Sequence, residues 1–415
     1  MVIRSIEYTN YKGLHSGTLS FDDHLTVIIG KNGSGKTSIL TAVRTLLSWI
    51  ISRLKSEKSN GSYIEERDIT NGHNHAKVTG TFDCFTVPIT IPNKSKPGIS
   101  KRFTLDIEGL REYTRDKREE FDSTRFKTSV PVFVYYGVKR AVIDVPLRIN
   151  EKEYTLLDTY KDCLNGAANF RDFFTWFRNQ EDIENELLNR GRNNDNGAAT
   201  RELDAFRHAL SKFMPEYSDV HVRRKPLRMV VRKGSEELIV NQLSDGEKIF
   251  LALIGDLCHR LVLANPTLPD PLQGQGIVLI DEIDLHLHPE WQGDIASCLT
   301  NVFPNIQFII STHSPHVINE VPTESLRILG DNSREASMAD YGYGMPSEIV
   351  LRDIMGLTHD VPENVAELTE AIYGKLNTDL EEAKELTARF ERLVPQRPEL
   401  VRIRKLIERL DRRAR

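Results

Sequence analysis

The apolar positions of this chain fall into short continuous runs and helically spaced stripes, a combination typical of α/β proteins. A continuous apolar run over 25–29 predicts a buried strand, and residues 38–54 carry apolar side chains at helical spacing directly after it. Two further runs, 130–136 and 277–280, also predict buried strands. We therefore expect a strand–loop–helix unit near the start and several strands buried in one core.

The remaining pattern predicts a second β region and a helical region. The expected strands cover 2–8, 19–21, 76–91, 102–108 and 307–310, and the expected helices cover 156–188, 200–214, 247–263 and a segment from 289. Residues 220–240 predict a hairpin, while 111–127 is a charged run that fits either a solvated helix face or a mobile loop. From 363 to 415 the chain is charged and helical, with helices on either side of 395–398.

Composition agrees with a soluble globular protein and restricts its function. The chain has 415 residues, a net charge of −5 and 39% hydrophobic residues, so contact with nucleic acid would need a local basic patch. Four cysteines lie far apart, without metal-ligand spacing or a disulfide framework: Cys84, Cys163, Cys258 and Cys298. No apolar run is long enough for a signal peptide core or a membrane span. We expect a cytoplasmic protein with reduced thiols and no membrane partner.

The loop between the first buried strand and its helix has the sequence GKNGSGKT, which matches the spacing of a P-loop. Such a loop turns backbone N–H groups toward a phosphate, and the helix N-terminus adds its positive end. The expected nucleotide-binding residues are Gly30, Lys31, Asn32, Gly33, Ser34, Gly35, Lys36, Thr37 and Ser38. Lys36 should reach the β and γ phosphates of ATP, and the Thr37 hydroxyl should bind Mg²⁺.

The segment GIVLIDEID, residues 276–284, is an apolar strand that ends in two carboxylates and is typical of a Walker B motif. Asp281 would hold Mg²⁺ and Glu282 would polarise the attacking water. Taken alone, the same pattern also fits a buried strand that ends in two solvated acids. A P-loop in the same chain favours the catalytic interpretation.

Two further motifs frame this strand. QLSDGEK precedes it and offers Ser244, Asp245, Gly246 and Glu247 at a helix N-terminus, where backbone donors can meet a phosphate, although the same residues also make a good Ser-capped helix start. FIISTHSPHVI follows it and places His313 at the end of the next apolar run. Asp284 lies between these two motifs, in the segment DLHLHPEWQ. The same segment contains His286 and His288, which have no further metal-ligand residues nearby.

The order P-loop, QLSDGEK, Walker B strand and His313 resembles the ABC-class ATPase heads of the RecF, SMC and Rad50 families. This resemblance implies an α/β fold, a P-loop NTPase with an antiparallel β subdomain and a helical lobe. It also implies that Ser244 and Gly246 act across a dimer interface, that Asp284 lies in the loop that crosses it, and that His313 contacts the γ-phosphate. One copy of each motif implies a homodimer with two composite ATP sites. The Q-loop glutamine of this class is not evident, and Gln180 is the candidate substitute.

Three segments narrow the resemblance to the PtuA family of ATPases from Septu defence systems and Septu-like retron modules. They are YYGVKRAVIDVPL, FRDFFTWFRNQEDIENE and the tail from DLEEAKELTARFERL to ELVRIRKLIERL. The resemblance implies a regulator of a separate HNH nuclease (PtuB-like) in anti-phage defence. In retron versions it implies a reverse transcriptase with its RNA–DNA hybrid. We expect an ATPase domain over 1–330, with a helical lobe and hairpin inserted at about 150–240, and a helical extension over 331–415 for partner binding.

Two other functions stay open from the sequence. One is a DNA-repair ATPase of RecF or Rad50 type, and the other is a scaffold that binds ATP without appreciable turnover. Basic residues cluster within 221–233 and 402–415, which fits either direct contact with DNA or solvated surfaces. The last helix also carries an apolar stripe, suited to packing or to a partner helix: Leu400, Ile403, Leu406, Ile407 and Leu410.

Overall fold

The computed structural model describes residues 1–93, 104–138, 153–189, 197–330, 336–339, 341–356, 361–376 and 378–414. Its internal contacts separate two compact units, Met1–Ser347 and Glu348–Arg415. The YYGVKRAVIDVPL segment lies largely outside the described residues. The segment GRNNDNG, residues 191–197, is expected from its composition to be a linker or mobile loop, and all but its last residue also lie outside them. Among the helices within the described ranges, none combines the length and the apolar character required to cross a bilayer.

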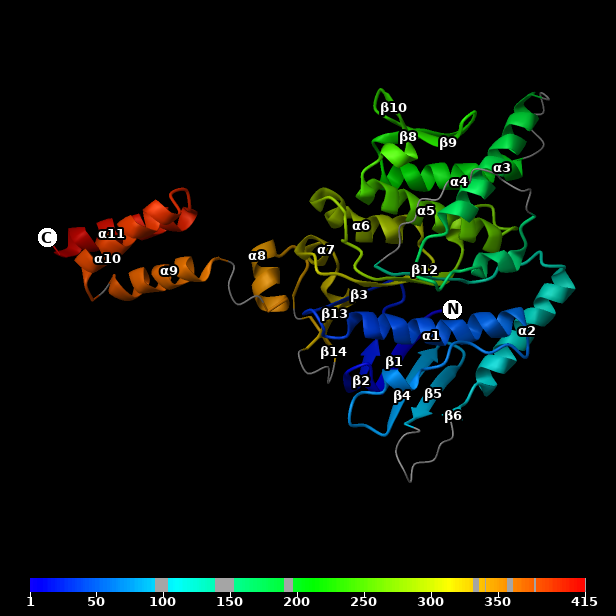
Figure 1. Ribbon diagram of the computed structural model, residues 1–415, viewed down its shortest axis with the longest axis horizontal. Helices are drawn as coiled ribbons and strands as arrows, with labels where there is room; N and C mark the ends of the chain where they lie inside the picture. Colours follow the sequence, from blue (N-terminus) through cyan, green and yellow to red (C-terminus); the bar gives the residue numbers. More distant parts are fainter. Residues whose placement is uncertain are drawn as a thin grey trace. The chain divides into compact units, whose positions relative to one another are not determined.

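A largely parallel sheet forms the centre of the first unit (Figure 1). Its strand order is β14-β13-β3-β12-β11-β7, and only the edge strand β14 runs antiparallel to its neighbour. The strands are β3 Leu25–Gly30, β7 Val132–Tyr136, β11 Gly276–Ile280, β12 Ile306–Ser311, β13 Leu326–Leu329 and β14 Ala336–Met338. Every residue of β3, β7, β11 and β12 is buried, as expected for strands covered on both faces. The predicted buried strands are therefore confirmed.

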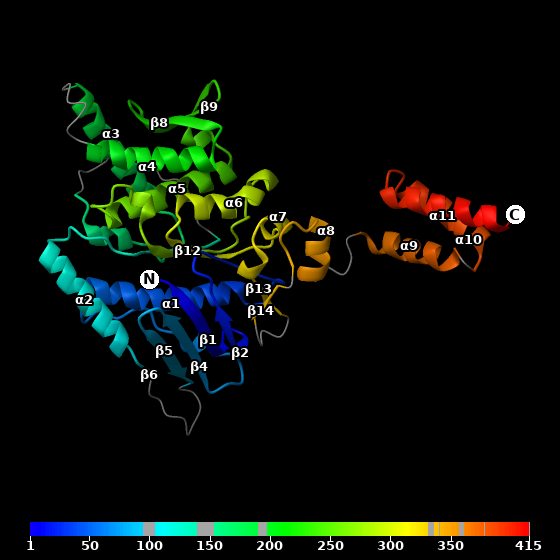
Figure 2. The same cartoon turned by 180° about the vertical axis from the view of Figure 1, so that it is seen from behind.

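A second, antiparallel sheet covers the far side of helix α1 (Lys36–Lys55). Its order is β2-β1-β4-β5-β6, with β1 Ile3–Tyr11, β2 Leu14–Ser20, β4 His75–Phe82, β5 Thr86–Pro92 and β6 Thr104–Leu105. Both views show α1 between the two sheets, and it contacts strands of each (Figures 1 and 2). This position explains why α1 is apolar around most of its circumference.

Residues 102–103 of the strand expected over 102–108 lie outside the described residues. Of the rest, only Thr104–Leu105 form a strand, and helix α2 (Glu108–Thr124) begins at the end of the predicted range. The Asp106 carboxylate accepts a hydrogen bond from the Glu108 amide at 3.2 Å, which satisfies a donor at the helix start. The buried residues of α2 are only Leu110, Thr114 and Phe121, so most of its surface is polar. The charged run at 111–127 is therefore mainly a solvated helix rather than a mobile loop.

Helices pack on the other face of the parallel sheet (Figure 2). They are the 3₁₀ turn η2 Leu156–Tyr160, α3 Phe170–Asn189, α4 Gly197–Phe213, α5 Asp245–Ala264, α6 Pro289–Val302 and the short α7 Pro315–Asn319. The aromatic residues of the segment FRDFFTWFRNQEDIENE connect three of these helices. The Phe173 ring of α3 lies 5.0 Å from the Phe206 ring of α4, and it also covers Gly255 on α5. A Cβ atom at Gly255 would lie 2.7 Å from the Phe173 ring, so the close packing requires glycine.

The predicted hairpin is a three-stranded meander. Its strands are β8 Tyr217–Arg224, β9 Leu227–Lys233 and β10 Glu236–Ile239, in the order β10-β9-β8. Gly234 has a φ of 58°, a left-handed conformation that favours glycine, and it turns the chain back for the third strand. The hairpin prediction did not anticipate the other turn, at Lys225–Pro226 between β8 and β9.

The second unit contains three helices, α9 Glu363–Lys375, α10 Leu380–Leu393 and α11 Pro398–Ala414. The short α8 Ser347–Ile349 and a π turn over Val350–Ile354 precede them. Their buried core consists of Val365, Leu368, Ile372, Phe390, Leu400 and Ile403. The predicted break near 395–398 is confirmed, and a further one lies before α10, where Asp379 caps the helix. Two residues of the predicted apolar stripe thus pack inside this unit.

A buried ion pair connects the helical region to the central sheet. The Arg260 Nε atom donates to Asp256 at 2.9 Å, and the Tyr136 hydroxyl donates to the same carboxylate at 2.8 Å. Arg260 also donates to the carbonyl oxygens of Thr159 and Lys161 at 2.6 and 2.9 Å. Asp256 is 1% exposed and Arg260 is 3% exposed. These contacts fix η2, α5 and β7 to one another.

We expect Asp256→Ala to lower the free energy of unfolding by about 3–5 kcal/mol, because it leaves the buried Arg260 guanidinium without its counter-ion. Urea-induced unfolding followed by circular dichroism measures the change. Asp23→Ala is the matched control, since Asp23 pairs with Arg4 on an exposed surface, and it should cost less than about 1 kcal/mol. Equal effects of the two substitutions would contradict the structural role of the buried pair.

Candidate active site

The P-loop joins β3 to α1 and depends on glycine at fixed positions. Gly33 and Gly35 have φ values of 82° and 104°, which favour glycine. A Cβ atom at Gly30 would lie 2.7 Å from the Leu329 carbonyl oxygen, and one at Gly35 would lie 2.4 Å from Leu14. A Cβ atom at Gly33 would meet nothing within 4 Å, so the outer side of the turn is open. The loop therefore has the shape of a phosphate cradle.

Lys36 is the first residue of α1 and is only 6% exposed. Its Nζ atom donates to the carbonyl oxygens of Gly30 at 2.8 Å and Lys31 at 3.1 Å. Burial lowers the pKa of Lys36 below its ordinary value, and nearby carboxylates act in the opposite direction. Because an ammonium group has three donors, one further hydrogen bond to a phosphate oxygen is available.

The Asp281 carboxylate connects the P-loop to the ends of two strands. One oxygen accepts from the Thr37 hydroxyl at 2.9 Å, and the other accepts from the Ser311 hydroxyl at 2.5 Å. Ser311 also accepts from the Glu282 amide at 2.8 Å. Glu282 has a φ of 48°, a left-handed conformation that is uncommon outside glycine. The structure thus brings together the predicted metal ligands and the predicted catalytic carboxylate.

Thr37 and Asp281 fit a magnesium site by their chemistry, since hydroxyl and carboxylate oxygens are ligands that Mg²⁺ prefers. Among the described residues, no group of three or more His, Cys, Asp or Glu side chains has the arrangement of a protein-only metal site. Mg²⁺ in kinase and ATPase sites normally uses one or two protein oxygens together with phosphate oxygens. The two ligands present therefore match a metal that binds with its nucleotide.

His313 lies at the same edge of the sheet. The Asp284 carboxylate accepts from the Thr312 hydroxyl at 2.6 Å and from the His313 amide at 3.3 Å. Burial lowers the pKa of His313 below its ordinary value, and the positive charge of Lys36 lowers it further. The carboxylates of Asp281, Glu282 and Asp284 act on both His313 and Lys36, in the direction of raising each pKa. His313 is therefore neutral at pH 7 and belongs to the same electrostatic cluster.

The QLSDGEK motif forms the N-terminus of α5. Ser244 is the N-cap, and it exchanges hydrogen bonds with Glu247 in a capping box. Gly246 lies against the Asp284 loop, because a Cβ atom there would be 2.1 Å from the His286 carbonyl oxygen. The structure therefore confirms that these residues form a Ser-capped helix start. Ser244 and Asp245 are nevertheless exposed, so this helix end is open to another molecule.

Glu247 has a second set of partners in the meander. Its carboxylate accepts from the Tyr217 hydroxyl and from Lys233 Nζ, the latter at 2.9 Å. Burial tends to raise the pKa of Glu247, but hydrogen bonds from Tyr217, Lys233 and Ser244 outweigh it and lower the pKa to about 2. The position of the α5 N-terminus is thus tied to β8 and β9.

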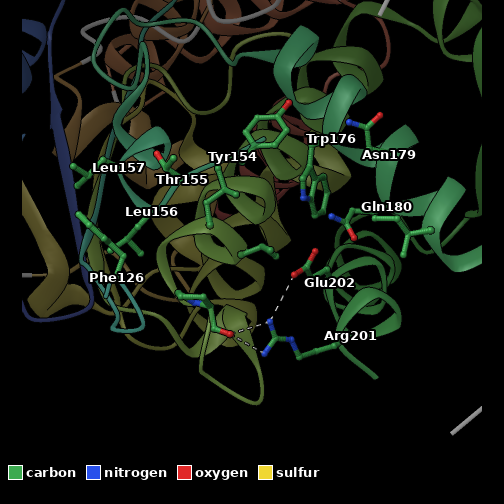
Figure 3. A pocket seen from close by; sticks show the side chains of 14 residues that line it. Phe126, Tyr154, Thr155, Leu156, Leu157, Trp176, Asn179, Gln180, Arg201 and Glu202 are labelled. Atoms are coloured by element: carbon green, nitrogen blue, oxygen red, sulfur yellow. Dashed lines mark hydrogen bonds and ion pairs between the residues drawn. The ribbon is translucent and has the colours of Figure 1, made fainter. Parts of the chain in front are cut away.

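Among the described residues, two predicted parts of the nucleotide site, residues 244–247 and Gln180, are not connected to the P-loop of the same chain. No hydrogen bond or ion pair recorded for the described residues links 244–247 to the P-loop of the same chain. Gln180, the candidate Q-loop residue, lines a separate cavity with Tyr154 and Trp176 (Figure 3). None of the P-loop or Walker B residues lines that cavity. The structure therefore gives Gln180 no contact with the expected nucleotide site.

The basic cluster on the meander is largely neutralised within the chain. Arg223 pairs with Glu237, Arg224 with Glu181 and Asp182, and Arg232 with Asp219. Lys233 pairs with Glu216 and Glu247. These pairs leave little positive charge for phosphate contacts there. His288 caps α6 through its ring nitrogen, which supports the assignment of the two neighbouring histidines to loop structure.

Sequence reasoning gave no role to Ser311 or Gln292. Ser311 holds both Asp281 and the Glu282 amide. Gln292 accepts from the Ser314 hydroxyl at 2.6 Å and donates to the Leu287 carbonyl oxygen at 2.9 Å, so it fixes the segments before and after the sheet edge. Only the position of Ser311 at the end of an apolar run, beside the Walker B strand, could have signalled its role.

Comparison with known proteins places this site in a family. Residues 25–319 match the family described as "AAA domain, putative AbiEii toxin, Type IV TA system". The "Retron Ec83 probable ATPase" of Escherichia coli is 31% identical over 87% of this chain and 77% of its own length. The "Septu protein PtuA" of Bacillus thuringiensis is 25% identical over 86% of this chain and 85% of its own length. Among solved structures, the "SMC head domain from Thermotoga maritima" aligns with 17% identity and a TM-score of 0.43, over 82% of this chain and 100% of that chain.

We expect Glu247→Gln to lower the free energy of unfolding at pH 7 by about 1–3 kcal/mol, because charged hydrogen bonds are lost. The ionised carboxylate stabilises the fold fully above pH 4.5, its ordinary pKa, and this stabilisation is lost as pH falls toward 2. The difference between the two proteins should therefore shrink between pH 7 and pH 3.5 in urea unfolding. Glu236→Gln on the exposed strand β10 is the control. If the difference in unfolding free energy between Glu247→Gln and the wild-type protein did not depend on pH, this would contradict the lowered pKa of Glu247.

Proposed function

This chain belongs to the ATPase family of the retron Ec83 and Septu PtuA proteins, and from that membership we propose that it hydrolyses ATP at two sites shared by a homodimer and thereby controls a separate nuclease in anti-phage defence. The observation that carries the catalytic part is the hydrogen-bonded series Thr37–Asp281–Ser311–Glu282. This series supports the proposal, because it holds the two proposed metal ligands next to the backbone of the proposed catalytic residue Glu282.

Lys36 and the P-loop amides would bind the phosphates of ATP. Lys36 is already oriented by two loop carbonyl oxygens, so little side-chain entropy remains to be lost when it meets a phosphate. Thr37 and Asp281 would hold Mg²⁺ by their oxygens. When bound, the metal supplies positive charge that stabilises the developing charge on the phosphate oxygens.

Glu282 would orient the attacking water and accept its proton. Its backbone is fixed on both sides, because the Glu282 amide donates to Ser311 and the Ile283 amide donates to the Ser311 carbonyl oxygen at 3.0 Å. This anchoring holds the residue in its left-handed conformation, which local preference alone would disfavour. His313, held neutral by burial and by Lys36, would donate or accept one hydrogen bond at the γ-phosphate.

Ser244 and Gly246 would complete the site of a second copy. Each chain carries one P-loop and one exposed α5 N-terminus, and the backbone N–H groups at such an end favour an anion. A two-fold arrangement that places each α5 N-terminus against the partner's P-loop gives two equivalent sites. The Asp284 loop, packed against Gly246, would lie at the same interface.

The partner in this proposal is an HNH nuclease of PtuB type. A reverse transcriptase with its RNA–DNA hybrid would join it if the protein acts in a retron. The names of the relatives support the defence setting. Within the Glu348–Arg415 unit, Val401 and Leu406 of α11 are 56% and 37% exposed, so the unit retains apolar surface for a partner.

We expect Glu282→Gln to reduce ATP turnover at least about 100-fold while preserving ATP binding, because general-base assistance is removed and the phosphate ligands stay. The variant should accumulate as a dimer in Mg²⁺–ATP, as seen by light scattering. Glu290→Gln, a neighbouring exposed carboxylate, is the matched control and should behave as wild type. Full turnover in Glu282→Gln would exclude Glu282 as the base.

A mixing experiment tests the composite sites. Lys36→Ala and Ser244→Arg should each abolish turnover alone, but an equimolar mixture should regain roughly a quarter of wild-type activity. Half of the dimers would then be mixed, and each mixed dimer would contain one intact site out of two. No recovery, with both variants folded and able to exchange subunits, would contradict a site shared between copies.

Recovery of the full chain from its native locus tests the partner. We expect a stoichiometric HNH protein in a gentle affinity purification, identified by mass spectrometry. Extraction of a small DNA–RNA species with a reverse transcriptase would identify a retron assembly. A bare ATPase homodimer, obtained repeatedly, would contradict the nuclease partner without affecting the ATPase proposal.

A further inference from the structure

A cavity of about 800 Å³ lies among the helices of the first unit, away from the ATP site (Figure 3). Its walls come from α3, α4, η2 and the end of α5. A volume of this size is typical of small-molecule sites. Because it shares no lining residue with the P-loop or the Walker B strand, its function is separate from the hydrolysis proposed above.

The cavity has rigid aromatic walls. Trp176 is 1% exposed, and its ring lies 5.1 Å from the His259 ring, which in turn lies 5.1 Å from the Tyr154 ring in an edge-on contact. The Tyr154 hydroxyl is fixed by a hydrogen bond of 3.2 Å to the Asp172 carbonyl oxygen. Phe126, Leu156 and Leu157 lie across the cavity from Trp176 (Figure 3). Since the Trp176 face is almost completely covered, Tyr154 and Phe126 present the accessible aromatic surface to a flat apolar ring.

Several hydrogen-bonding groups on one helix face are available to a ligand. Trp176, Asn179 and Gln180 stand at positions i, i+3 and i+4 of α3, which places them on the same side of the helix. In the described part of the chain, the indole N–H and the two amides have no protein hydrogen-bond partner. All three residues line the cavity. They offer both donors and acceptors, as the edge of a heterocycle requires.

The charges in the cavity argue against a phosphate ligand. Arg201 lies 3.8 Å from Glu202, and it also donates to the Leu268 carbonyl oxygen at 2.7 Å. Burial raises the pKa of Glu202 above its ordinary value, and Arg201 acts in the opposite direction. Among the described residues that line the cavity, Arg201 is the only cation, and it is paired within the wall. A neutral ligand suits this balance better than a nucleotide.

We propose that this cavity binds an uncharged, planar heteroaromatic group of the nucleobase class. Aromatic side chains stack on bases, and Asn and Gln amides recognise base edges through paired donors and acceptors. The Glu202 carboxyl group adds a further polar contact on the wall formed by α4. Such a group can come from a free nucleoside or from an unstacked base of a single strand.

Binding is tested on the full-length protein with its ATP site saturated by a non-hydrolysable ATP analogue and Mg²⁺. Adenosine, guanosine, cytidine and uridine are titrated by calorimetry, and at least one is expected to bind with a Kd on the order of 0.1 mM. Gln180→Ala should weaken that binding at least about fivefold. Asn185→Ala, an exposed amide on the same helix, is the matched control and should change nothing.

Two single strands of equal length distinguish the sources of the base. One is an ordinary oligonucleotide and the other is abasic, so both present the same phosphates. The ligand is a base of a strand if the ordinary strand binds more tightly than any nucleoside. In that case the abasic strand should not show this higher affinity, and Gln180→Ala should remove it. Equal affinity for strand and nucleoside indicates a free ligand. The proposal would be overturned if neither Gln180→Ala nor Trp176→Phe changed the affinity for the probes. It would also be overturned if none of the probes bound.

Discussion

The Asp281 carboxylate is the contact on which the active site depends. Its two oxygens join the start of α1, through Thr37, to the end of β12, through Ser311. Parallel strands bring their carboxyl ends to one edge of a sheet, so residues far apart in sequence meet there. The Asp281 contacts convert this proximity into a fixed geometry. The same serine also anchors the backbone of Glu282, so the proposed metal ligand and the main chain of the proposed base are held by one residue.

The same aspartate is connected to the helical region by a second route. Its amide donates to the Tyr136 carbonyl oxygen at 2.8 Å, and the Tyr136 hydroxyl leads through Asp256 and Arg260 to the Thr159 carbonyl oxygen in η2. Every side chain in this series is buried. Since η2 also forms one wall of the aromatic cavity, the two sites share a continuous polar framework through the core. The framework is a physical connection between the sheet and the helices.

The sequence predicted the strands and the helix that position the candidate active site better than it predicted the rest of the molecule. The P-loop and Asp281 stand next to apolar runs whose only stable arrangement is a buried parallel sheet, so local pattern was enough. The β6–α2 boundary was missed because its signal, the Asp106 carboxylate that accepts from the Glu108 amide, lies in a charged stretch without clear periodicity. The Tyr136–Asp256–Arg260 series joins residues more than a hundred positions apart, and no local pattern reports such a contact. Gln180 was misplaced for a related reason, since residue type alone does not give the direction of a helix face.

Glu247 has a consequence for how this protein can change over evolutionary time. One carboxylate both caps the α5 N-terminus and holds the meander through Tyr217 and Lys233. The outer strands of the meander could therefore be exchanged or lengthened between lineages without disturbing the nucleotide site, provided that the two donors facing Glu247 are kept. Variation in the meander and constancy of the P-loop edge would then be inherited separately.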